Sequence, residues 1–195
     1  LVIPEGVETP EEVSEDWILI KQPVKNLYLV SSAVMDMFQS LNSLSAIGFS
    51  AQKAEGWYVA SAREAMEEGN ILYAGKYNKP DYELIVSKGC SLAIENRMIT
   101  HSPEVKEMLE SFGIPVMIEY SSAEAHPLGR VEWIKFFGAL LGKEEEAKKA
   151  FAVQEEILKN VEAKEKTDLT VGFFYVTANG MVQVRQSNDY IPKLI

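Results

Sequence analysis

Histidine and cysteine are scarce in this sequence of 195 residues, which contains two histidines and one cysteine. A structural zinc site needs about four ligands at short, regular spacings, and these three residues do not supply them. A single cysteine cannot form a disulfide within the chain, and Cys90, just before an apolar run, is expected to be a buried and unreactive thiol. The low cysteine content therefore does not indicate whether the protein acts in an oxidising or a reducing compartment.

Basic residues are also few, with 19 Lys and Arg against 29 Asp and Glu and a formal net charge of -10. Binding to nucleic acid depends on clustered positive charge, so nucleic acid is not expected as a partner. No apolar run reaches the length of a membrane-spanning helix. We expect a trimmed form of the protein, because the sequence opens inside a predicted strand at 1–3 without a secretion signal.

Common catalytic and cofactor motifs are missing as well. The sequence has neither the Gly-x-Ser-x-Gly turn of the α/β-hydrolases nor the Gly-x-Gly-x-x-Gly turn of dinucleotide-binding proteins. Residues 138–143 (GALLGK) come closest to a phosphate-binding loop. They have one residue too few between the glycines, and Glu144 follows where Ser or Thr is required.

From residue 27 to residue 119 the sequence alternates short apolar runs with helical segments. This alternation predicts an α/β fold in which helices cover both faces of a parallel sheet. The expected strands are 27–30, 46–49, 71–74, 91–95 and 115–119. The expected helices are 33–41, a segment that ends at 68, 81–88 and 103–112. We assign residues 1–127 to this N-terminal lobe.

The strongest helical pattern lies at residues 128–166, where apolar side chains such as Ile134, Phe137 and Phe151 recur about every 3.6 positions. Gly142 is expected to kink or briefly break this helix. A helix of this length would reach roughly 50 Å at about 1.5 Å per residue, which is too long for one small lobe. We therefore expect it to link two lobes.

Residues 167–195 have a different pattern. Two predicted strands, 170–177 and 181–185, flank the pair Asn179-Gly180, which is typical of a hairpin turn. Residues 189–195 have the pattern of a first helical turn. About thirty residues cannot bury a core by themselves, so we expect the start of a second α/β lobe that is incomplete within this sequence.

Ligands of open α/β sheets bind beyond the carboxyl ends of the strands. The loops expected there carry aromatic and polar side chains that suit a bulky, partly anionic ligand. The candidate ligand residues in these loops are Ser31, Ser32, Trp57, Tyr58, Lys76, Tyr77, Asn96, Arg97, Glu124 and His126. Arg185, on the predicted hairpin, would contact the ligand from the opposite side. We expect one cleft to be lined by Trp57, Tyr58, Tyr77 and His126.

Simpler roles are open for several of these residues. Trp57 and Tyr58 can pack on their own helix, and Arg185 can be a solvated strand residue. His126 lies near two glutamates in the sequence, but further ligands at metal-binding spacing are missing. No metal site is therefore expected.

Four segments, in order, carry a resemblance to a known family. They are residues 27–38 (LYLVSSAVMDMF), 75–85 (GKYNKPDYELI), 91–95 (SLAIE) and 126–144, which begins with HPLGRVEWIK and ends with LLGKE. Together they resemble the substrate-binding proteins of ABC transporters for iron siderophores, haem and cobalamin. The resemblance covers about residues 27–195.

The resemblance implies two α/β lobes joined by one long helix, with a ligand held between them and delivered to a membrane permease. The implied ligand is a metal chelate, either a ferric siderophore or haem, with cobalamin as the alternative. Such proteins are not enzymes, have no resident cofactor and act outside the cytoplasm at the cell surface, often through a lipid anchor. In this family a surface glutamate on each lobe contacts permease arginines, and Glu83 occupies the matching place in residues 80–83 (PDYE).

Two other classes of function stay open. A small α/β enzyme of the hydrolase type would use Glu124 and His126 as acid and base, although the missing motifs favour a binding protein. An interaction or sensor module is the third class. The predicted hairpin is apolar and has little chain to cover it, so we also expect a dimer or an exchanged second lobe.

Overall fold

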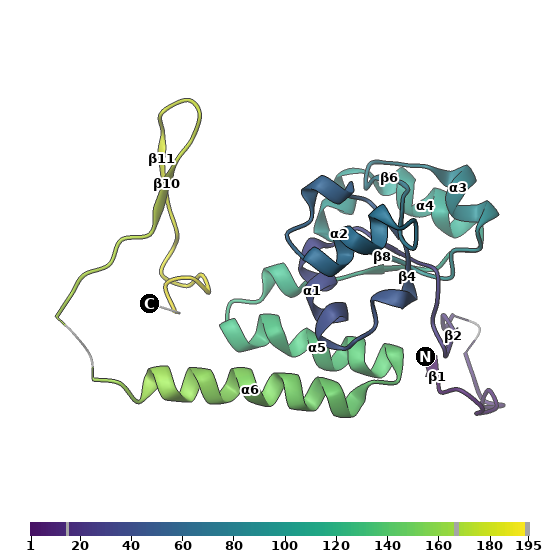
Figure 1. Cartoon of the computed structure of the whole chain (residues 1–195), viewed down its shortest axis with the longest axis horizontal. Coiled ribbons are helices and arrows are strands. Elements are labelled where there is room, and N and C mark those ends of the chain that lie inside the picture. Colours follow the sequence, from purple (N-terminus) through teal and green to yellow (C-terminus); the bar gives the residue numbers. More distant parts are fainter. Residues whose placement is uncertain (15, 166–167, 194–195) are drawn as a thin grey trace.

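The N-terminal lobe is built on a parallel sheet in the computed structural model, which describes residues 1–14, 16–165 and 168–193 (Figure 1). The strands of this sheet are β3 (Leu27–Leu29), β4 (Ile47–Ser50), β5 (Leu72–Tyr73), β8 (Ala93–Glu95) and β9 (Val116–Ile118). Their order is β5-β4-β3-β8-β9, and each neighbouring pair is parallel. The predicted parallel sheet is confirmed.

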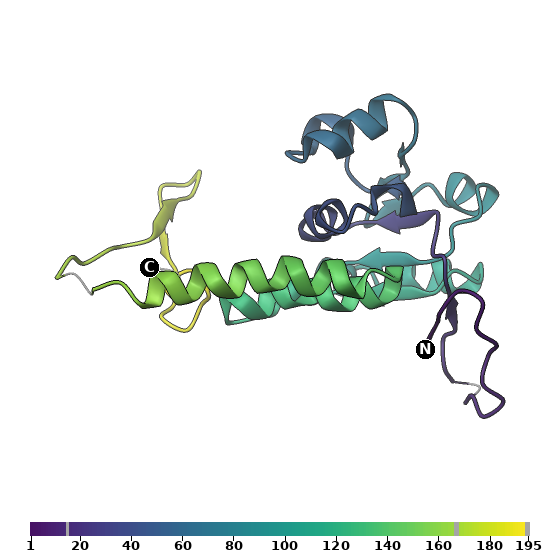
Figure 2. The ribbon, with the colours of Figure 1, turned by 60° about the horizontal axis from the view of Figure 1, so that its bottom comes forward.

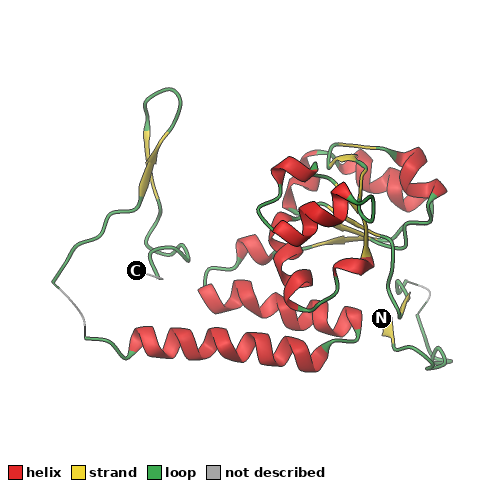
Figure 3. Ribbon diagram, viewed as in Figure 1, coloured by secondary structure: helices red, strands yellow, loops and turns green. Residues whose placement is uncertain are grey.

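Helices cover both faces of this sheet (Figure 3). The α-helices are α1 (Ser32–Ser40), α2 (Ala60–Glu67), α3 (Tyr82–Ser87), α4 (Pro103–Ser111), α5 (Pro127–Leu141) and α6 (Glu144–Glu162). The short 3₁₀ helices are η1 (Leu44–Ala46), η2 (Ala54–Gly56), η3 (Arg97–His101) and η4 (Ser121–Ala123). On one face Phe38 of α1 and Phe137 of α5 share a core cluster, with ring centroids 5.6 Å apart. On the other face Ile85 of α3 and Leu109 of α4 share a second cluster. The predicted α/β class, with helices on both faces, is thus confirmed.

The central strand β3 shows why the sheet is stable in this arrangement. Leu27 and Leu29 belong to one core cluster and Tyr28, between them, belongs to the other. Side chains alternate between the faces of a strand, so a strand covered on both faces needs a continuous apolar run. All three side chains are fully buried.

The described residues that precede β3 contribute Val24 to the core and a cap to α5. β1 (Val2–Ile3) and β2 (Ile20–Lys21) form a short parallel pair. After β2, the Nε2 of Gln22 donates to the carbonyl oxygens of Ala139 and Leu140, at 2.7 and 3.2 Å. Carbonyls in the last turn of a helix lack intrahelical partners, so Gln22 satisfies two of them.

The segment expected to be one long linking helix is a pair of antiparallel helices. α5 ends at Leu141, α6 begins at Glu144, and α6 runs back along α5 (Figure 2). Gly142 has a φ of 67°, a left-handed conformation that glycine adopts without the steric cost of a Cβ. The glycine expected to kink the helix therefore ends α5 and reverses the chain.

Close packing between α5 and α6 stabilises this reversal. A Cβ added to Gly138 would lie 2.5 Å from the Cβ of Ala147, so the two helices approach this closely only because residue 138 is glycine. Ala147 and Phe151 of α6 join the core cluster that contains Phe137 of α5. The helices that follow the predicted lobe boundary at residue 127 thus contribute to the core of the N-terminal lobe. In the described ranges no helix, α6 included, is both long and apolar enough to cross a membrane.

α6 leads from the lobe to a C-terminal hairpin, which stands apart from the sheet (Figure 1). β10 (Phe174–Val176) and β11 (Val182–Val184) pair antiparallel and confirm the predicted hairpin, with shorter strands than expected. Residues 187–193 form turns and a bend where a helix was expected to begin. Residues 194 and 195, like the predicted lobe boundary at 166 and 167, lie outside the described residues. A third short pair, β6 (Gly75–Lys76) and β7 (Lys79–Pro80), is antiparallel and precedes α3.

Candidate functional site

A buried hydrogen-bond network joins the carboxyl ends of β3 and β9. Glu119 is only 1% exposed, and its Oε1 accepts a hydrogen bond of 2.5 Å from the Oγ of Ser31. Its Oε2 accepts a bond of 2.8 Å from the backbone N–H of Ser121. The Ser31 hydroxyl, a candidate ligand contact, makes no capping bond to α1 and donates to Glu119 instead. The network fixes the start of η4 at the edge of the sheet.

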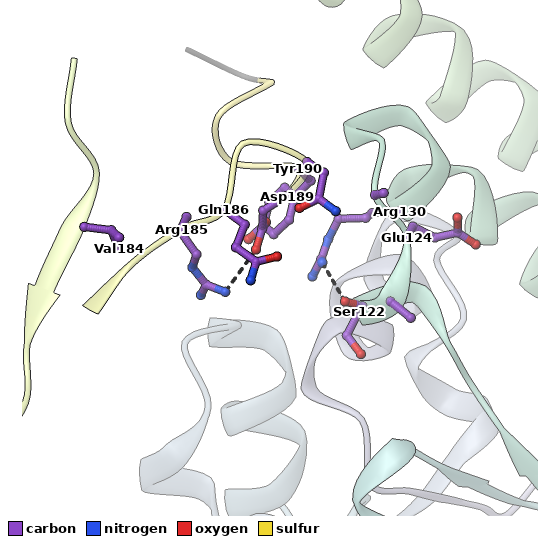
Figure 4. Close-up of a pocket in the computed structure, with 11 residues that line it drawn as sticks. Ser122, Glu124, Arg130, Val184, Arg185, Gln186, Asp189 and Tyr190 are labelled. Carbon is purple, nitrogen blue, oxygen red and sulfur yellow. Dashed lines mark hydrogen bonds and ion pairs between the residues drawn. The ribbon is translucent and has the colours of Figure 1, made fainter. Parts of the chain in front are cut away.

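A cavity of about 620 Å³ lies between this edge and the segment that follows β11 (Figure 4). Its volume is in the range of small-molecule sites. The residues that line it are Ser122, Ala123, Glu124, Ala125, Arg130, Val184, Arg185, Gln186, Asn188, Asp189 and Tyr190. Its two walls therefore come from parts of the chain that are far apart in sequence: one lies at η4 and the start of α5, and the other lies beyond α6.

Arg130 projects into this cavity from the first turns of α5 and lies between Ser122 and Tyr190 (Figure 4). Its Nη1 donates to the carbonyl oxygen of Ser122 at 3.1 Å. Its Cζ lies 4.0 Å from the centroid of the Tyr190 ring, which is a cation–π contact. These two contacts orient the guanidinium group of Arg130, whose planar shape suits bidentate binding of carboxylates and similar anions.

The opposite wall carries a second guanidinium group. The Nη1 of Arg185 forms an ion pair of 3.2 Å with the Oδ2 of Asp189. Glu124, on the same side as Arg130, accepts a hydrogen bond of 3.1 Å at its Oε1 from the Nε1 of Trp133. Among the predicted ligand residues, Glu124 and Arg185 line the cavity, on opposite walls.

Trp57 is a core residue, which makes its prediction as a cleft residue wrong. It is 4% exposed and packs in the core cluster of α1 and α2. Its Nε1 donates to the Oγ of Ser50 at 3.1 Å, so the polar atom of the indole is satisfied inside the lobe. The next residue, Tyr58, is 100% exposed. The side chains of Trp57 and Tyr58 therefore point in opposite directions. Of the two roles considered for Trp57, only packing within the lobe holds.

The other predicted residues stand outside the cavity lining. Ser32 is exposed at the start of α1, Lys76 is exposed in β6, and Tyr77 is half-buried in the turn that follows β6. The side-chain oxygen of Asn96 accepts from the backbone N–H of Met98 at 2.8 Å and so caps η3. Arg97, within η3, is exposed.

His126 caps the helix that carries Arg130. Its Nδ1 accepts a hydrogen bond of 3.2 Å from the backbone N–H of Leu128, and the side chain is exposed. Pro127 occupies the first helical position, where its missing N–H costs nothing. His126 therefore positions the start of α5, next to the cavity.

Sequence reasoning missed Arg130, Asp189 and Tyr190. Arg130 stands four residues after His126, one helical turn into a segment already placed at the carboxyl edge of the sheet. Extending the candidate loop by one turn of helix would have included it. Asp189 and Tyr190 follow the predicted hairpin, and only the folded chain brings them to α5.

One buried carboxyl group of the lobe has no partner. Glu95, at the end of β8, is fully buried, and neither of its side-chain oxygens has a hydrogen bond within the described residues. Burial raises the pKa of Glu95 to about 8. The structure places it in the interior of the sheet and outside the cavity lining.

Metal ligands do not gather in the described part of the chain: it has no group of three or more His, Cys, Asp and Glu side chains that could hold a metal ion.

Comparison in sequence gives two lipoproteins of Methanocaldococcus jannaschii, one of which is 28% identical over 204 residues that cover all of this chain and 51% of the relative. The other is 25% identical over 197 residues, which cover 95% of this chain and 46% of the relative. The chain thus spans about half the length of these relatives. No family model matches the chain.

Solved structures give a closer answer about the fold. The periplasmic haem-binding protein HutB of Vibrio cholerae matches with a TM-score of 0.65 at 17% identity, over 82% of this chain and 58% of that protein. The siderophore-binding protein BauB, in complex with ferric iron and two molecules of acinetobactin, matches with a TM-score of 0.67 at 14% identity, over 87% and 58%. The resemblance found in the sequence is confirmed at the level of the fold: this chain has the fold of periplasmic haem-binding and siderophore-binding proteins, over somewhat more than half of their length.

Proposed function

We propose that this chain is part of the substrate-binding component of an ABC importer, which captures a metal chelate and delivers it to a membrane permease. The N-terminal lobe and the segment after β11 would grip the ligand from two sides. A ferric siderophore or haem is the proposed ligand class. Cobalamin, the alternative within the same family, has no specific support among the similar proteins.

The observation that carries this proposal is the cavity between the two parts of the chain. It has a guanidinium group on each wall, Arg130 and Arg185. Ferric siderophores and haem present carboxylate or other anionic oxygens, which such groups bind in a bidentate manner. The tyrosine ring of Tyr190 adds an apolar face for the organic part of the ligand.

Location and partner follow from the same proposal. The relatives in Methanocaldococcus jannaschii are lipoproteins and HutB is periplasmic, which supports a place outside the cytoplasm with a lipid anchor. Glu83 is exposed in the first turn of α3 and is the proposed contact for permease arginines. A dimer through the hairpin remains a prediction.

The enzyme alternative has less support. Glu124 bonds to the indole N–H of Trp133, and His126 accepts the backbone N–H of Leu128. A general acid and base need to reach a shared substrate position, whereas these two side chains are engaged with separate structural partners.

Titration with candidate chelates tests the proposal. We expect quenching of tryptophan fluorescence by haemin or a ferric tris-catecholate, and weaker quenching by cyanocobalamin. Arg130→Ala should weaken chelate binding about tenfold, which corresponds to about 1.4 kcal/mol. Arg97→Ala is the matched control, because Arg97 is exposed and outside the cavity.

Two outcomes would contradict this function. One is equal chelate affinity of the Arg130→Ala, Arg97→Ala and unsubstituted proteins. The other is turnover of a bound small molecule, which would favour the enzyme alternative. Native mass spectrometry of the protein from its own host would identify the ligand that it carries.

A further inference from the structure

A second groove, of about 500 Å³, lies between β9 and one face of α5. The residues that line it are Met117, Ile118, Glu124, Gly129, Glu132, Trp133 and Phe136. The four from α5 are spaced three, one and three residues apart and therefore share one face of the helix. Gly129 lets the carboxylate of Glu124 lie against the start of α5, since a Cβ there would lie 3.2 Å from the Oε2 of Glu124.

The strand beside this groove is an edge of the sheet. Within the described ranges β9 pairs with β8 alone. The carbonyl of Pro115 and the N–H of Glu119 each bond to β8 at 2.9 Å. Backbone groups alternate in direction along a strand, so Val116 and Ile118 direct their N–H and C=O groups away from the sheet. Such an edge is a template for one more strand.

The groove combines aromatic rings with negative charge. The ring centroids of Trp133 and Phe136 lie 5.9 Å apart, with planes at 58°, and Phe136 is 47% exposed. Glu124 fixes the indole through its bond to Nε1. The charged residues that line the groove in the described chain are both acidic, Glu124 and Glu132. Rings and carboxylates in this combination favour an ammonium or guanidinium group.

The carboxylate of Glu132 remains available for such a group. It pairs with Lys135 at 3.0 Å, but its side chain is 57% exposed. Exposed pairs of this kind contribute little free energy, so a cation in the groove can compete for Glu132.

We propose that the β9 edge and this groove together bind an extended peptide segment of a partner protein. The segment adds a strand beside β9 through the backbone of Val116 and Ile118. One of its Lys or Arg side chains lies over Trp133 and Phe136, between Glu124 and Glu132. Backbone pairing supplies affinity and the groove selects the side chain, as in other cases of strand addition. The inference stands on the N-terminal lobe and does not depend on the ligand of the cavity.

Charge favours this occupant over a second copy of the chain. The chain carries a net charge of -10, and symmetric pairing of two β9 strands would bring the Glu132 carboxylates of both copies to one interface. A free organic cation would fill the groove and leave the backbone of Val116 and Ile118 unpaired. Both alternatives are distinguishable by experiment.

The test is a titration of the isotope-labelled chain, followed by NMR, with the blocked peptide acetyl-TVKVT-amide. Saturable shifts are expected for the indole N–H of Trp133 and for the amides of Val116 and Ile118. Two control peptides should bind at least tenfold more weakly. One is TVEVT, with the charge reversed, and the other is TVKVT with alternate backbone nitrogens methylated.

Protein variants supply the matched comparison. Glu132→Lys and Phe136→Ala should each weaken peptide binding at least fivefold, and both sites are exposed enough to leave the fold intact. Glu107→Lys, an equal change of charge on exposed α4, should leave binding unchanged. Equal binding by all three variants would overturn the proposal.

Three further results would also overturn it. Shifts confined to the indole, with equal affinity for the methylated peptide, would show a small-cation site. A dimer that light scattering detects and that Glu132→Lys abolishes would show a second copy as the occupant. So would a dimer in which the amides of β9 are protected from hydrogen exchange without peptide. Absence of saturable shifts would remove the site.

Discussion

The guanidinium group of Arg130 stacks on the ring of Tyr190, with 4.0 Å between Cζ and the ring centroid. A second contact lies nearby, where the Nζ of Lys193 donates to the carbonyl oxygen of Ala125 at 2.8 Å. Together they hold the C-terminal segment against α5 and the loop that precedes it. The proposed ligand cavity therefore depends on two contacts between residues that are far apart in the chain.

Tyr190→Ala should loosen this segment. The lost cation–π contact joins two half-buried side chains and is worth about 0.5–2 kcal/mol, so amide hydrogen exchange in residues 185–193 should become at least a few times faster. Chelate affinity should fall because one wall of the cavity is less ordered. Tyr190→Phe keeps the ring and should behave as the unsubstituted protein. Unchanged exchange in Tyr190→Ala would show that the stacking contributes nothing.

Trp57→Phe should destabilise the lobe without changing ligand binding. The variant leaves the Oγ of Ser50 without the indole N–H as a partner and opens a small gap in the core. A loss of about 1–3 kcal/mol in the free energy of unfolding is expected by urea titration. Tyr58→Ala, at the exposed neighbour, should stay within about 0.5 kcal/mol. If Trp57→Phe bound chelate more weakly but were as stable as the unsubstituted protein, Trp57 would belong to the ligand site.

The sequence predicts the lobe well because its signals are local. Strands such as β3 are continuous apolar runs, and helices such as α4 begin with Pro103 at the first position. The hairpin was found from Asn179-Gly180, a pair that favours tight turns. Each of these elements depends on residues within a few positions of one another.

The errors arise where distant residues decide the outcome. Gly142 can kink a helix or end it, and the close approach of Gly138 to Ala147 selects the reversal. Trp57 faces inward, where Ser50, at the end of the preceding strand β4, accepts its N–H. Tyr190 reaches Arg130 only in the folded chain. Periodicity and loop position do not contain this information.

Stability should fall as the pH rises from about 4.5 to 8, because of Glu95. Burial raises the pKa of this carboxyl group to about 8, so the folded lobe keeps a proton that the unfolded chain releases above about pH 4.5. The loss should approach 1.4 kcal/mol per pH unit within this window, since the folded state resists ionisation. Urea unfolding at several pH values measures the slope.

Glu95→Gln separates this effect from the rest of the protein. Glutamine stays neutral at every pH, so the slope due to residue 95 should disappear and the variant should be the more stable form near pH 8. Glu107→Gln, on exposed α4, should keep the slope of the unsubstituted protein. Parallel pH profiles for Glu95→Gln and the unsubstituted protein would show that Glu95 ionises normally.

The hairpin should promote self-association of these 195 residues. Phe174, Val176, Val182 and Val184 are exposed, and in the described residues β10 and β11 pair only with each other. Exposed apolar strands with free edges pair readily with another copy. Light scattering should show a dimer at high concentration, and Val182→Lys with Val184→Lys should make it monomeric. A monomer in both forms would remove this expectation.

Glu83→Lys should weaken docking to the proposed permease and leave chelate binding unchanged. Glu83 is exposed in the first turn of α3, whose N-cap Asp81 accepts the backbone N–H of Leu84 at 3.0 Å. A lysine there opposes the positive end of the helix dipole by a few tenths of a kcal/mol, so the fold should persist. Its charge would repel permease arginines and mainly slow association.

Glu107→Lys is the control for docking, since it makes the same change of charge on another exposed helix. Uptake and permease binding should fall for Glu83→Lys and persist for Glu107→Lys, measured with protein of natural length. Slower association that high salt abolishes would support a charge contact, because salt screens such attraction within about 10 Å at 0.1 M. If both variants dock as well as the unsubstituted protein, Glu83 is a solvated carboxylate, and docking depends on another surface of the lobe.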